Sequence, residues 1–425
     1  MPILYAYYGD DFTGSTDVLE QLASNGVSSV LFLGAPTAEH LAEFASVQGI
    51  GIAGESRSRT PQWMTENLPA IFSTLQRLGV PVTHYKVCST FDSSPSCGSI
   101  GRAMEIGREI FSPAFIPVVV GAPHLRRYVA FGNLFAAAPE RSVQRIDRHP
   151  MSRHPVTPML EADLRIHLAA QTEIKIGLVD TAMIQSGIAA EVVASLVGGG
   201  DEAILFDTID AQTQSEVGEL IWREASRRPI FSASSSGLTA ALLSEWKTLG
   251  LLPDAPEPRA VAIAEPLLVV SGSCSAATER QLRYALACGY HGIAIDPVDL
   301  LEGGHDRILA AAVYALTRGS NTILYTALGS PAEAVHGDQL GTALGILLRE
   351  ILARTSVRRV LICGGDTASH AVQQLGLYAL TWAANLQPGA PLCRAHADSD
   401  LHGLELVLKG GQVGTEDFFD VVRGT

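Results

Sequence analysis

The chain has no apolar run as long as the roughly 20 residues that a membrane-spanning helix needs. Its opening residues, MPILYAYYGDD, lack the basic segment with which a signal peptide begins. Its six cysteines include no C-x-x-C pair and no compact cysteine–histidine cluster, which argues against a disulfide framework or a zinc site. These absences predict a cytoplasmic protein with free thiols and no membrane partner.

Positive charge is scarce as well, because 30 lysines and arginines face 44 aspartates and glutamates for a formal net charge of −14. An acidic surface repels phosphate backbones, so no nucleic-acid partner is expected. Any anionic substrate needs a local cluster of positive side chains that overcomes the repulsion from the acidic surface. With 425 residues and 47% hydrophobic content, the chain is globular and too long for one ordinary core, so two domains are expected.

Short β-rich runs alternate with helical stretches, which favours parallel sheets covered on both faces by helices. Four prolines within 253–266 cannot sustain a helix or a central strand, so residues 251–266 are interpreted as a linker. The sequence predicts an α/β fold with domains at 1–250 and 267–425, each with a mainly parallel sheet flanked by helices, and a ligand cleft between them. The expected strands are 3–8, 29–33, 49–53, 83–87, 116–120, 174–179, 203–206, 267–270, 292–295, 322–325, 359–362 and 404–408.

Three loops of the second half carry glycines and small hydroxyl residues just past an expected strand, where open α/β sheets bind ligands. Glycine lets the backbone approach a ligand, and free amides at a helix start attract anions. One such loop could be an ordinary turn, but three in one domain favour a polyphosphate. The predicted nucleotide-binding residues are Ser271, Gly272, Ser273, Gly364, Gly365, Asp366, Thr367, Gly410 and Gly411.

The first half offers acids, bases and hydroxyls at the equivalent positions. Asp10 and Asp11 follow the first expected strand, and such carboxylates can accept a hydroxyl proton or hold Mg²⁺ through water. One of the two could instead cap the following helix. Both are predicted as catalytic, with no direct metal ligand assigned.

Cations and hydroxyls elsewhere in this half suit a carboxylate-bearing substrate. Arginine grips a carboxylate through two parallel hydrogen bonds, and lysine can neutralise one. The plain alternative is a solvated lysine and a turn aspartate. The predicted substrate-binding residues are Arg57, Lys86, Ser89, Thr90, Asp92 and Arg127.

These motifs together resemble the four-carbon acid sugar kinase family over nearly the whole chain. The family's D-D-F-T-G and C-S-T-F-D signatures form a specific combination, and both are present here. The matching segments are Asp10–Asp17, Lys86–Ser93, Gly132–Phe135, His154–Met159, Ser271–Ser275, Gly364–Thr367 and Lys409–Gly411. The resemblance implies an ATP-dependent kinase that acts on a tetronate or 3-oxo-tetronate, with the acid sugar in the N-terminal domain and ATP in the C-terminal domain.

The sequence departs from the family pattern at two places in the expected pocket. Tyr8 and Gly9 stand where alanine is usual, and Glu55 replaces the lysine of a Lys-Ser-Arg triplet. A branched sugar acid such as 3-oxo-isoapionate is therefore an alternative substrate. The expected ligands are the sugar acid, ATP and Mg²⁺; the sequence does not fix the oligomeric state, and a homodimer is one expectation.

Two other classes of function fit the sequence less well. An NAD-dependent sugar-acid dehydrogenase needs a glycine fingerprint after a strand, but the G-x-G-x-x-G at Gly49, Gly51 and Gly54 lies inside an expected strand. A non-catalytic sugar-acid binding protein is often exported, and no signal segment is recognisable. The kinase interpretation is preferred over both.

Overall fold

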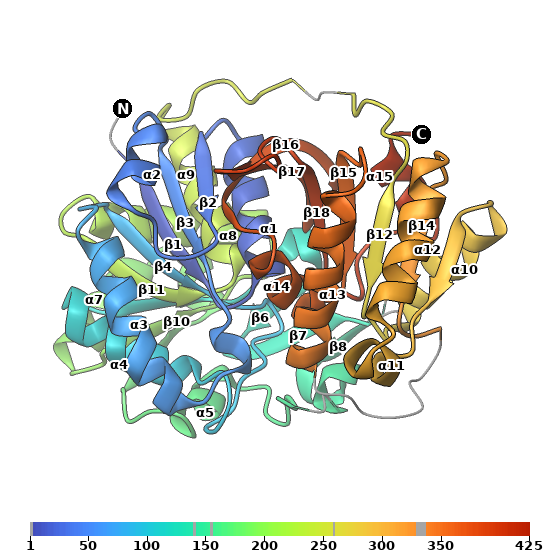
Figure 1. The fold of residues 1–425 in the computed structure, drawn as a ribbon. Coiled ribbons are helices and arrows are strands. Elements are labelled where there is room, and N and C mark those ends of the chain that lie inside the picture. Colours follow the sequence, from blue (N-terminus) through green and yellow to red (C-terminus); the bar gives the residue numbers. More distant parts are fainter. Residues whose placement is uncertain (1–2, 139–141, 154–155, 258–259, 329–336) are drawn as a thin grey trace. The chain divides into compact units, whose positions relative to one another are not determined.

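The computed structural model describes residues 3–138, 142–153, 156–257, 260–328 and 337–425 (Figure 1). By compactness the chain divides into two units, and the division falls between Asp10 and Asp11. The first unit comprises Met1–Asp10, Asn25–Ser28 and Ser46–Ala255, and the second comprises Asp11–Ser24, Ser29–Ala45 and Pro256–Thr425. The domain limits expected from the sequence remain a prediction.

The first unit contains a parallel group of strands in the order β11–β4–β1–β3. All of their residues are buried, as expected of strands covered on both faces. Their carboxyl ends lie at one edge, because the four strands run in the same direction. The bounds are β1 Tyr5–Gly9, β3 Gly49–Ala53, β4 Val82–Lys86 and β11 Ile230–Ser234.

Two smaller sheets complete the first unit. One is parallel in the order β5–β10–β9, and the other is an antiparallel meander of β6, β7 and β8. The buried carboxylate of Asp207, just after β10, accepts the backbone N–H groups of Phe131 and Gly132 and so anchors the β6–β7 turn. The bounds are β5 Ile116–Val119, β6 Arg127–Ala130, β7 Asn133–Ala137, β8 Val143–Arg145, β9 Ile176–Val179 and β10 Ala203–Phe206.

Helices flank the sheets of the first unit, and most begin with a capping side chain. Thr60, for example, accepts the N–H of Trp63, and a proline occupies the first position of α3, both standard start signals. The α-helices are α3 Pro61–Gln76, α4 Ile100–Phe111, α5 Leu164–Ala169, α6 Thr181–Gln185, α7 Ala189–Gly198, α8 Ala211–Ala225 and α9 Ser236–Thr248. Short 3₁₀ helices are η1 Ser56–Ser58, η2 Pro123–Leu125, η3 Ile146–Arg148 and η4 Pro150–Arg153.

The second unit contains a mixed sheet. Strands β2, β16, β17 and β18 pair antiparallel in that order, and β18, β15, β12, β14 and β13 then follow in parallel. The parallel strands place three glycine-bearing loops at one edge. The bounds are β2 Ser29–Phe32, β12 Leu268–Ser271, β13 His291–Ala294, β14 Thr322–Tyr325, β15 Arg359–Cys363, β16 Leu377–Gln387, β17 Ala390–Ala397 and β18 Glu405–Lys409.

Helices cover this sheet too, and Figure 1 shows α13 beside α14. Helix α1, which carries Asp11 at its start, packs on β16, β17 and β18 and contacts α14. The helices are α1 Phe12–Ser24, α2 Ala38–Glu43, α10 Ala276–Ala287, α11 Pro297–Glu302, α12 His305–Thr317, α13 Gly337–Leu352, α14 Gly365–Gln373 and α15 Phe418–Arg423. Together the two units confirm the predicted α/β class with mainly parallel sheets flanked by helices.

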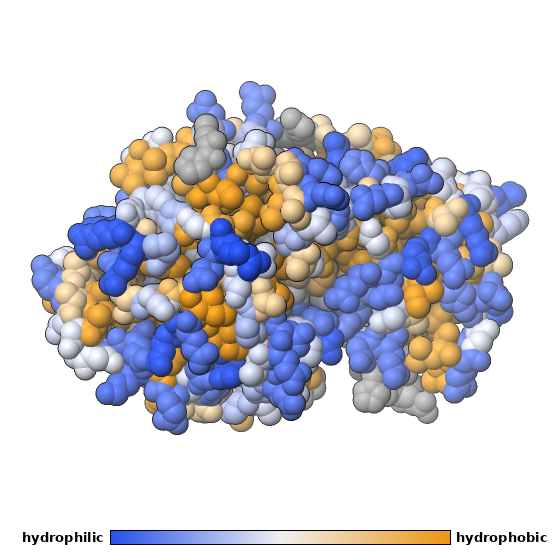
Figure 2. All heavy atoms as spheres, turned by 60° about the vertical axis from the view of Figure 1, so that its left-hand side comes forward, coloured by the Kyte–Doolittle hydropathy of each residue, from blue (hydrophilic) through white to orange (hydrophobic). Residues whose placement is uncertain are grey.

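The described residues of 251–266 form neither helix nor strand, in keeping with their prolines. On the face in Figure 2, hydrophilic side chains surround scattered hydrophobic patches, which is the normal mixture for a protein surface. Within the described ranges, every helix is too short or too polar to cross a membrane.

Candidate functional site

Asp10 directly follows β1 and is paired with an arginine. Its carboxylate forms a two-point ion pair with Arg57, with 3.1 Å between Nε and Oδ2 and 2.9 Å between Nη2 and Oδ1. The backbone adds two more bonds, because the Asp10 N–H donates to the Lys86 carbonyl and the Arg57 N–H donates to the Asp10 carbonyl. Asp10 is only 4% exposed, so this pair is largely shielded from water. Asp10 and Arg57, both predicted site residues, are therefore in direct contact. Arg57 uses the two N–H groups that could bind a substrate carboxylate to bind Asp10 instead.

Asp92 lies in a second polar cluster, in the loop after β4. Its Oδ1 is 2.5 Å from the Thr90 hydroxyl, and its Oδ2 accepts from the Thr157 hydroxyl at 3.4 Å. The Thr90 hydroxyl is also 3.0 Å from the sulfur of Cys88. The sequence singled out Thr90 and Asp92, but not Cys88 or Thr157. Thr157 belongs to the family segment 154–159, which was the available signal for it. His154, in the same segment, lies outside the described residues.

Cys88 shows which charged side chains surround this cluster. Burial raises the pKa of its thiol above the usual value, and the charge of Asp92 raises it further while that of Arg57 lowers it. Burial lowers the pKa of Arg127, and the charge of the nearby Cys88 raises it in part. The predicted residues Arg57, Asp92 and Arg127 thus all interact electrostatically with this thiol.

Arg127 differs from Arg57 in having donor capacity left over. Its Nη1 donates to the Leu125 carbonyl at 3.0 Å, but its buried Nε has no hydrogen-bond partner among the described residues. A buried guanidinium N–H without a partner is costly and is normally satisfied by a ligand or water. Lys86, the last residue of β4, is only 2% exposed, whereas Ser89 is intermediate in exposure. Arg127 is therefore the clearest open cation among the predicted substrate residues.

Asp11 starts α1 in the second unit. Its Oδ1 accepts the N–H of Gly14 at 2.7 Å and its Oδ2 accepts the hydroxyl of Thr13 at 2.9 Å, so it caps the helix. A Cβ built on Gly365 would lie 3.9 Å from the Asp11 Oδ2 and 3.9 Å from the Thr13 hydroxyl. Asp11 thus faces the glycine loop at the start of α14, and the sequence did not indicate the part played by Thr13.

The three glycine loops of the second unit meet at the carboxyl ends of β12, β15 and β18. A Cβ on Gly272 would lie 2.3 Å from the Thr367 hydroxyl, and one on Gly411 would lie 3.0 Å from the Ser273 hydroxyl. The N–H of Gly364, whose φ is +112°, donates to the Lys409 carbonyl at 2.9 Å. Glycine is required at these points because the loops approach one another too closely for side chains.

The loops also supply donors for an anion. Helix α14 begins at Gly365 and helix α10 begins at Ala276, so free amides lie at both starts. The Ser271 hydroxyl is buried and has no hydrogen-bond partner among the described residues. Asp366 is exposed in the first turn of α14. The predicted residues of the second half therefore form one compact group.

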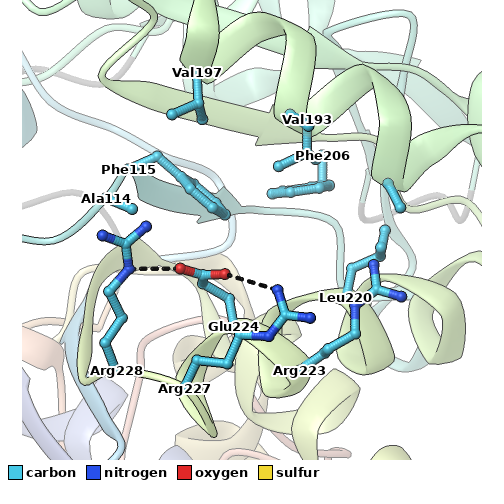
Figure 3. Close-up of a pocket in the computed structure, with 12 residues that line it drawn as sticks. Ala114, Phe115, Val193, Val197, Phe206, Leu220, Arg223, Glu224, Arg227 and Arg228 are labelled. Atoms are coloured by element: carbon cyan, nitrogen blue, oxygen red, sulfur yellow. Dashed lines mark hydrogen bonds and ion pairs between the residues drawn. The ribbon is translucent and has the colours of Figure 1, made fainter.

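The pocket in Figure 3 is a separate feature of the first unit. It has a volume of about 200 Å³ between α7 and α8, with apolar walls that include Val193 and Val197. Glu224 forms ion pairs with Arg227 and Arg228 on its rim, as the dashed lines in Figure 3 mark. None of the predicted site residues lines it, and the arginines lie at the carboxyl end of α8, where cations suit the helix dipole.

The described residues contain no group of three or more histidine, cysteine, aspartate or glutamate side chains that could hold a metal ion. Magnesium does not need such a cage in phosphate-transfer sites. It is bound through one or two carboxylates together with substrate phosphates and water. The carboxylates of Asp11 and Asp366, both beside the glycine loop, fit that mode of binding.

Comparison with known proteins gives these two half-sites a context. Residues 5–242 match the family model described as a sugar-binding N-terminal domain, and residues 268–419 match that of a nucleotide-binding C-terminal domain. A sugar-binding domain followed by a nucleotide-binding domain is the plan of a carbohydrate kinase.

Characterised relatives span almost the whole chain. A 3-oxo-isoapionate kinase from Paraburkholderia graminis is 44% identical over 99% of this chain and 94% of its own length. A 3-oxo-tetronate kinase from Pseudomonas savastanoi pv. phaseolicola is 31% identical over 96% of this chain and 94% of its own. The chain belongs to the four-carbon acid sugar kinase family, which confirms the resemblance seen in its motifs.

Solved structures share the fold. A protein from Salmonella typhimurium has a TM-score of 0.80 at 24% identity, with 99% of this chain and 98% of that chain covered. One from Haemophilus influenzae has a TM-score of 0.73 at 24% identity, with 99% of each chain covered. At this level of identity the likeness concerns the fold alone.

Proposed function

We propose that this protein is an ATP-dependent kinase that phosphorylates a hydroxyl of a small sugar acid. The observation that carries the proposal is the position of Asp11, whose carboxylate faces the Gly364–Thr367 loop within the second unit. A carboxylate beside a set of backbone amides can take a proton from an alcohol next to a bound phosphate. The glycine loops supply the amides and Asp11 supplies the base.

The substrate class follows from the relatives and from the charges of the first unit. A 3-oxo-isoapionate-like branched acid is favoured by the 44% identity to the kinase of that name, against 31% for the 3-oxo-tetronate kinase. The four-carbon acids remain the second candidates. Both candidates carry a carboxylate, which the open Nε of Arg127 suits.

In the proposed mechanism, Arg127 and Lys86 bind the carboxylate, and Asp92 with its threonine partners binds hydroxyls. Asp11 accepts the proton of the reacting hydroxyl as its oxygen attacks the γ-phosphorus of ATP. The bond between that phosphorus and the β–γ bridging oxygen breaks, and ADP leaves. Asp10, paired with Arg57, fixes the backbone immediately before Asp11.

Loop amides and the Ser271 hydroxyl stabilise charge on the transferred group, and most of the rate enhancement comes from positioning. Mg²⁺, if held by Asp366, would neutralise phosphate charge. The N-terminal domain would bind the acid and the C-terminal domain the nucleotide. A cytoplasmic location and a homodimer are part of the proposal.

The test is release of ADP in the presence of Mg²⁺ and a panel of acids: 3-oxo-isoapionate, both 3-oxo-tetronates, and the threonates and erythronates. We expect turnover with at least one acid and the highest kcat/KM with 3-oxo-isoapionate. Reduction of NAD by the same acids without ADP release would overturn the kinase in favour of a dehydrogenase. Tight binding of an acid with no turnover of either nucleotide would favour a binding protein.

A further inference from the structure

Lys409 is the last residue of β18 and is completely buried, although its side chain carries a positive charge. Burial of an ammonium is expensive unless hydrogen bonds replace the lost water. A lysine beside a phosphate-binding loop would ordinarily be interpreted as a phosphate ligand. Its contacts in this protein indicate a different role.

The ammonium of Lys409 has three hydrogens, and three acceptors of the protein lie within reach of them. Nζ is 2.9 Å from the Thr278 hydroxyl oxygen, 3.0 Å from the Gly410 carbonyl and 3.3 Å from the Gly411 carbonyl. All of its donors are therefore accounted for inside the second unit. No hydrogen remains for a phosphate oxygen.

The Gly411 carbonyl is the point on which these contacts converge. It accepts from the Lys409 ammonium, from the Thr278 hydroxyl at 2.9 Å, and from the Ser275 hydroxyl. Carbonyl and N–H of one peptide unit point in opposite directions because the unit is planar. Donors that hold the Gly411 carbonyl on the helix side therefore aim the next N–H, that of Gln412, away from them.

The backbone of Lys409 also holds the glycine loop that begins at Gly364. Its carbonyl accepts the N–H of Gly364, so one residue fixes the starts of two glycine loops. Its side chain reaches Thr278 in the first turn of α10 and thereby the third loop. The Cys363 sulfur lies close enough to Lys409 for each group to influence the other's pKa.

We infer that Lys409 is a positioning residue, which sets the peptide after Gly411 for nucleotide binding by holding the Gly411 carbonyl together with Thr278 and Ser275. This inference rests on the proposed nucleotide site. It assigns a role to three residues that the expected set of binding residues did not contain.

A first experiment measures whether the Lys409 amine is accessible. Trace labelling with acetic anhydride, followed by mass spectrometry, compares Lys409 with the exposed Lys175 and Lys247. We expect Lys409 to stay unlabelled both with and without ATP. Labelling in the free protein that ATP suppresses would identify a phosphate ligand and overturn the inference.

A second experiment measures nucleotide binding by calorimetry in a matched pair of variants. Thr278→Val removes the hydroxyl, whereas Thr278→Ser keeps it. We expect the Kd for ATP to rise about tenfold in Thr278→Val, the size of one lost hydrogen bond to a charged group, and to stay near the wild-type value in Thr278→Ser. Equal affinity in all three proteins would overturn the inference.

Lys409→Met completes the test, and thermal unfolding separates a folding defect from a binding defect. If both residues act on one carbonyl, the double variant Lys409→Met/Thr278→Val binds ATP hardly more weakly than Lys409→Met alone. Strict additivity would contradict a shared target. A wild-type protein that binds no nucleotide would overturn the proposed function instead, while the labelling result would still report on Lys409.

Discussion

The two proposed binding sites, one in each unit, rely on different chemical groups. The second unit offers backbone amides between glycines, with few side chains that reach the ligand site. The first unit offers side chains: one arginine that holds an aspartate, another with an open N–H, and an aspartate braced by threonines. A site made of backbone amides suits a ligand that many enzymes share, such as ATP. A site made of side chains can be altered by substitution to fit a different substrate.

This contrast explains where the sequence departs from its family. Glu55 stands in the first unit, and its carboxylate forms an ion pair with Arg59 at 2.8 Å. The glycine loops stay close to the family pattern, with Asp366 in place of the usual glutamate and Ala368 in place of the usual serine. Substrate choice can therefore vary in one unit without any change in nucleotide binding in the other.

The largest effect is expected at Asp11, which faces the glycine loop. Asparagine at this position can still accept the Gly14 N–H but cannot take a proton from the substrate. We expect kcat in Asp11→Asn to fall by about 10²–10⁴, the usual contribution of a general base. Steady-state kinetics of ADP release would measure this.

ADP affinity and the thermal midpoint should stay close to wild type in Asp11→Asn. Asp10→Asn is the matched comparison, since it loses part of the ion pair with Arg57. A near-normal kcat in Asp11→Asn, with a collapse in Asp10→Asn, would move the base to Asp10.

The next effect tests the backbone site. In Gly272→Ala the added methyl would lie 2.3 Å from the Thr367 hydroxyl, so one of the loops must shift. We expect KM for ATP to rise about tenfold or more, as when a hydrogen bond to a charged group is lost, with KM for the acid unchanged. Gly34→Ala is the control, because no atom lies within 4 Å of its new methyl.

A smaller effect tests the side-chain site. Arg127→Met removes the open guanidinium, and we expect KM for the acid to rise about tenfold, the range of a charge-assisted bond. KM for ATP should not change. Arg126→Met, at the exposed neighbour, is the matched control; equal effects in both variants would show that the loss reflects general charge rather than a specific contact.

Much of the fold follows from the pattern of the sequence. The apolar runs at 116–120, 203–206 and 322–325 form the buried strands β5, β10 and β14, because a strand covered on both faces has no polar side to show. The hairpin of β16 and β17 was missed, since its small residues dilute the alternation. Pro388 and Gly389 at its turn were the available signal.

Some residues of the candidate site could also be predicted from the sequence, and others could not. Glycine loops after strands can be recognised locally, because each signal lies within a few residues. The Asp10–Arg57 pair spans 47 positions and the Asp92–Thr157 contact spans 65, so neither partner could be named from spacing. Lys409 could be recognised from its motif in the sequence. Only the three acceptors of its ammonium indicate that it positions the glycine loop and does not bind phosphate.

The smallest effect concerns the stability of α1, the helix that carries Asp11. Burial raises the pKa of Glu20 to about 8, and its carboxylate accepts the N–H of Gly389 in the β16–β17 turn. The unfolded chain loses this proton near the ordinary glutamate pKa of 4.5. Between these two pKa values the folded protein holds more protons, so the free energy of unfolding falls as pH rises.

The fall from this group is at most about 1.4 kcal/mol per pH unit and ends above the folded pKa. Glu20→Gln keeps an oxygen for the Gly389 N–H and removes the titration. Denaturant unfolding at pH 5, 7 and 9 should therefore show the variant gaining stability relative to wild type as pH rises, with no further gain above the folded pKa. Parallel profiles for the two proteins would mean that Glu20 titrates normally, and that α1 is held to the β16–β17 turn without a buried proton.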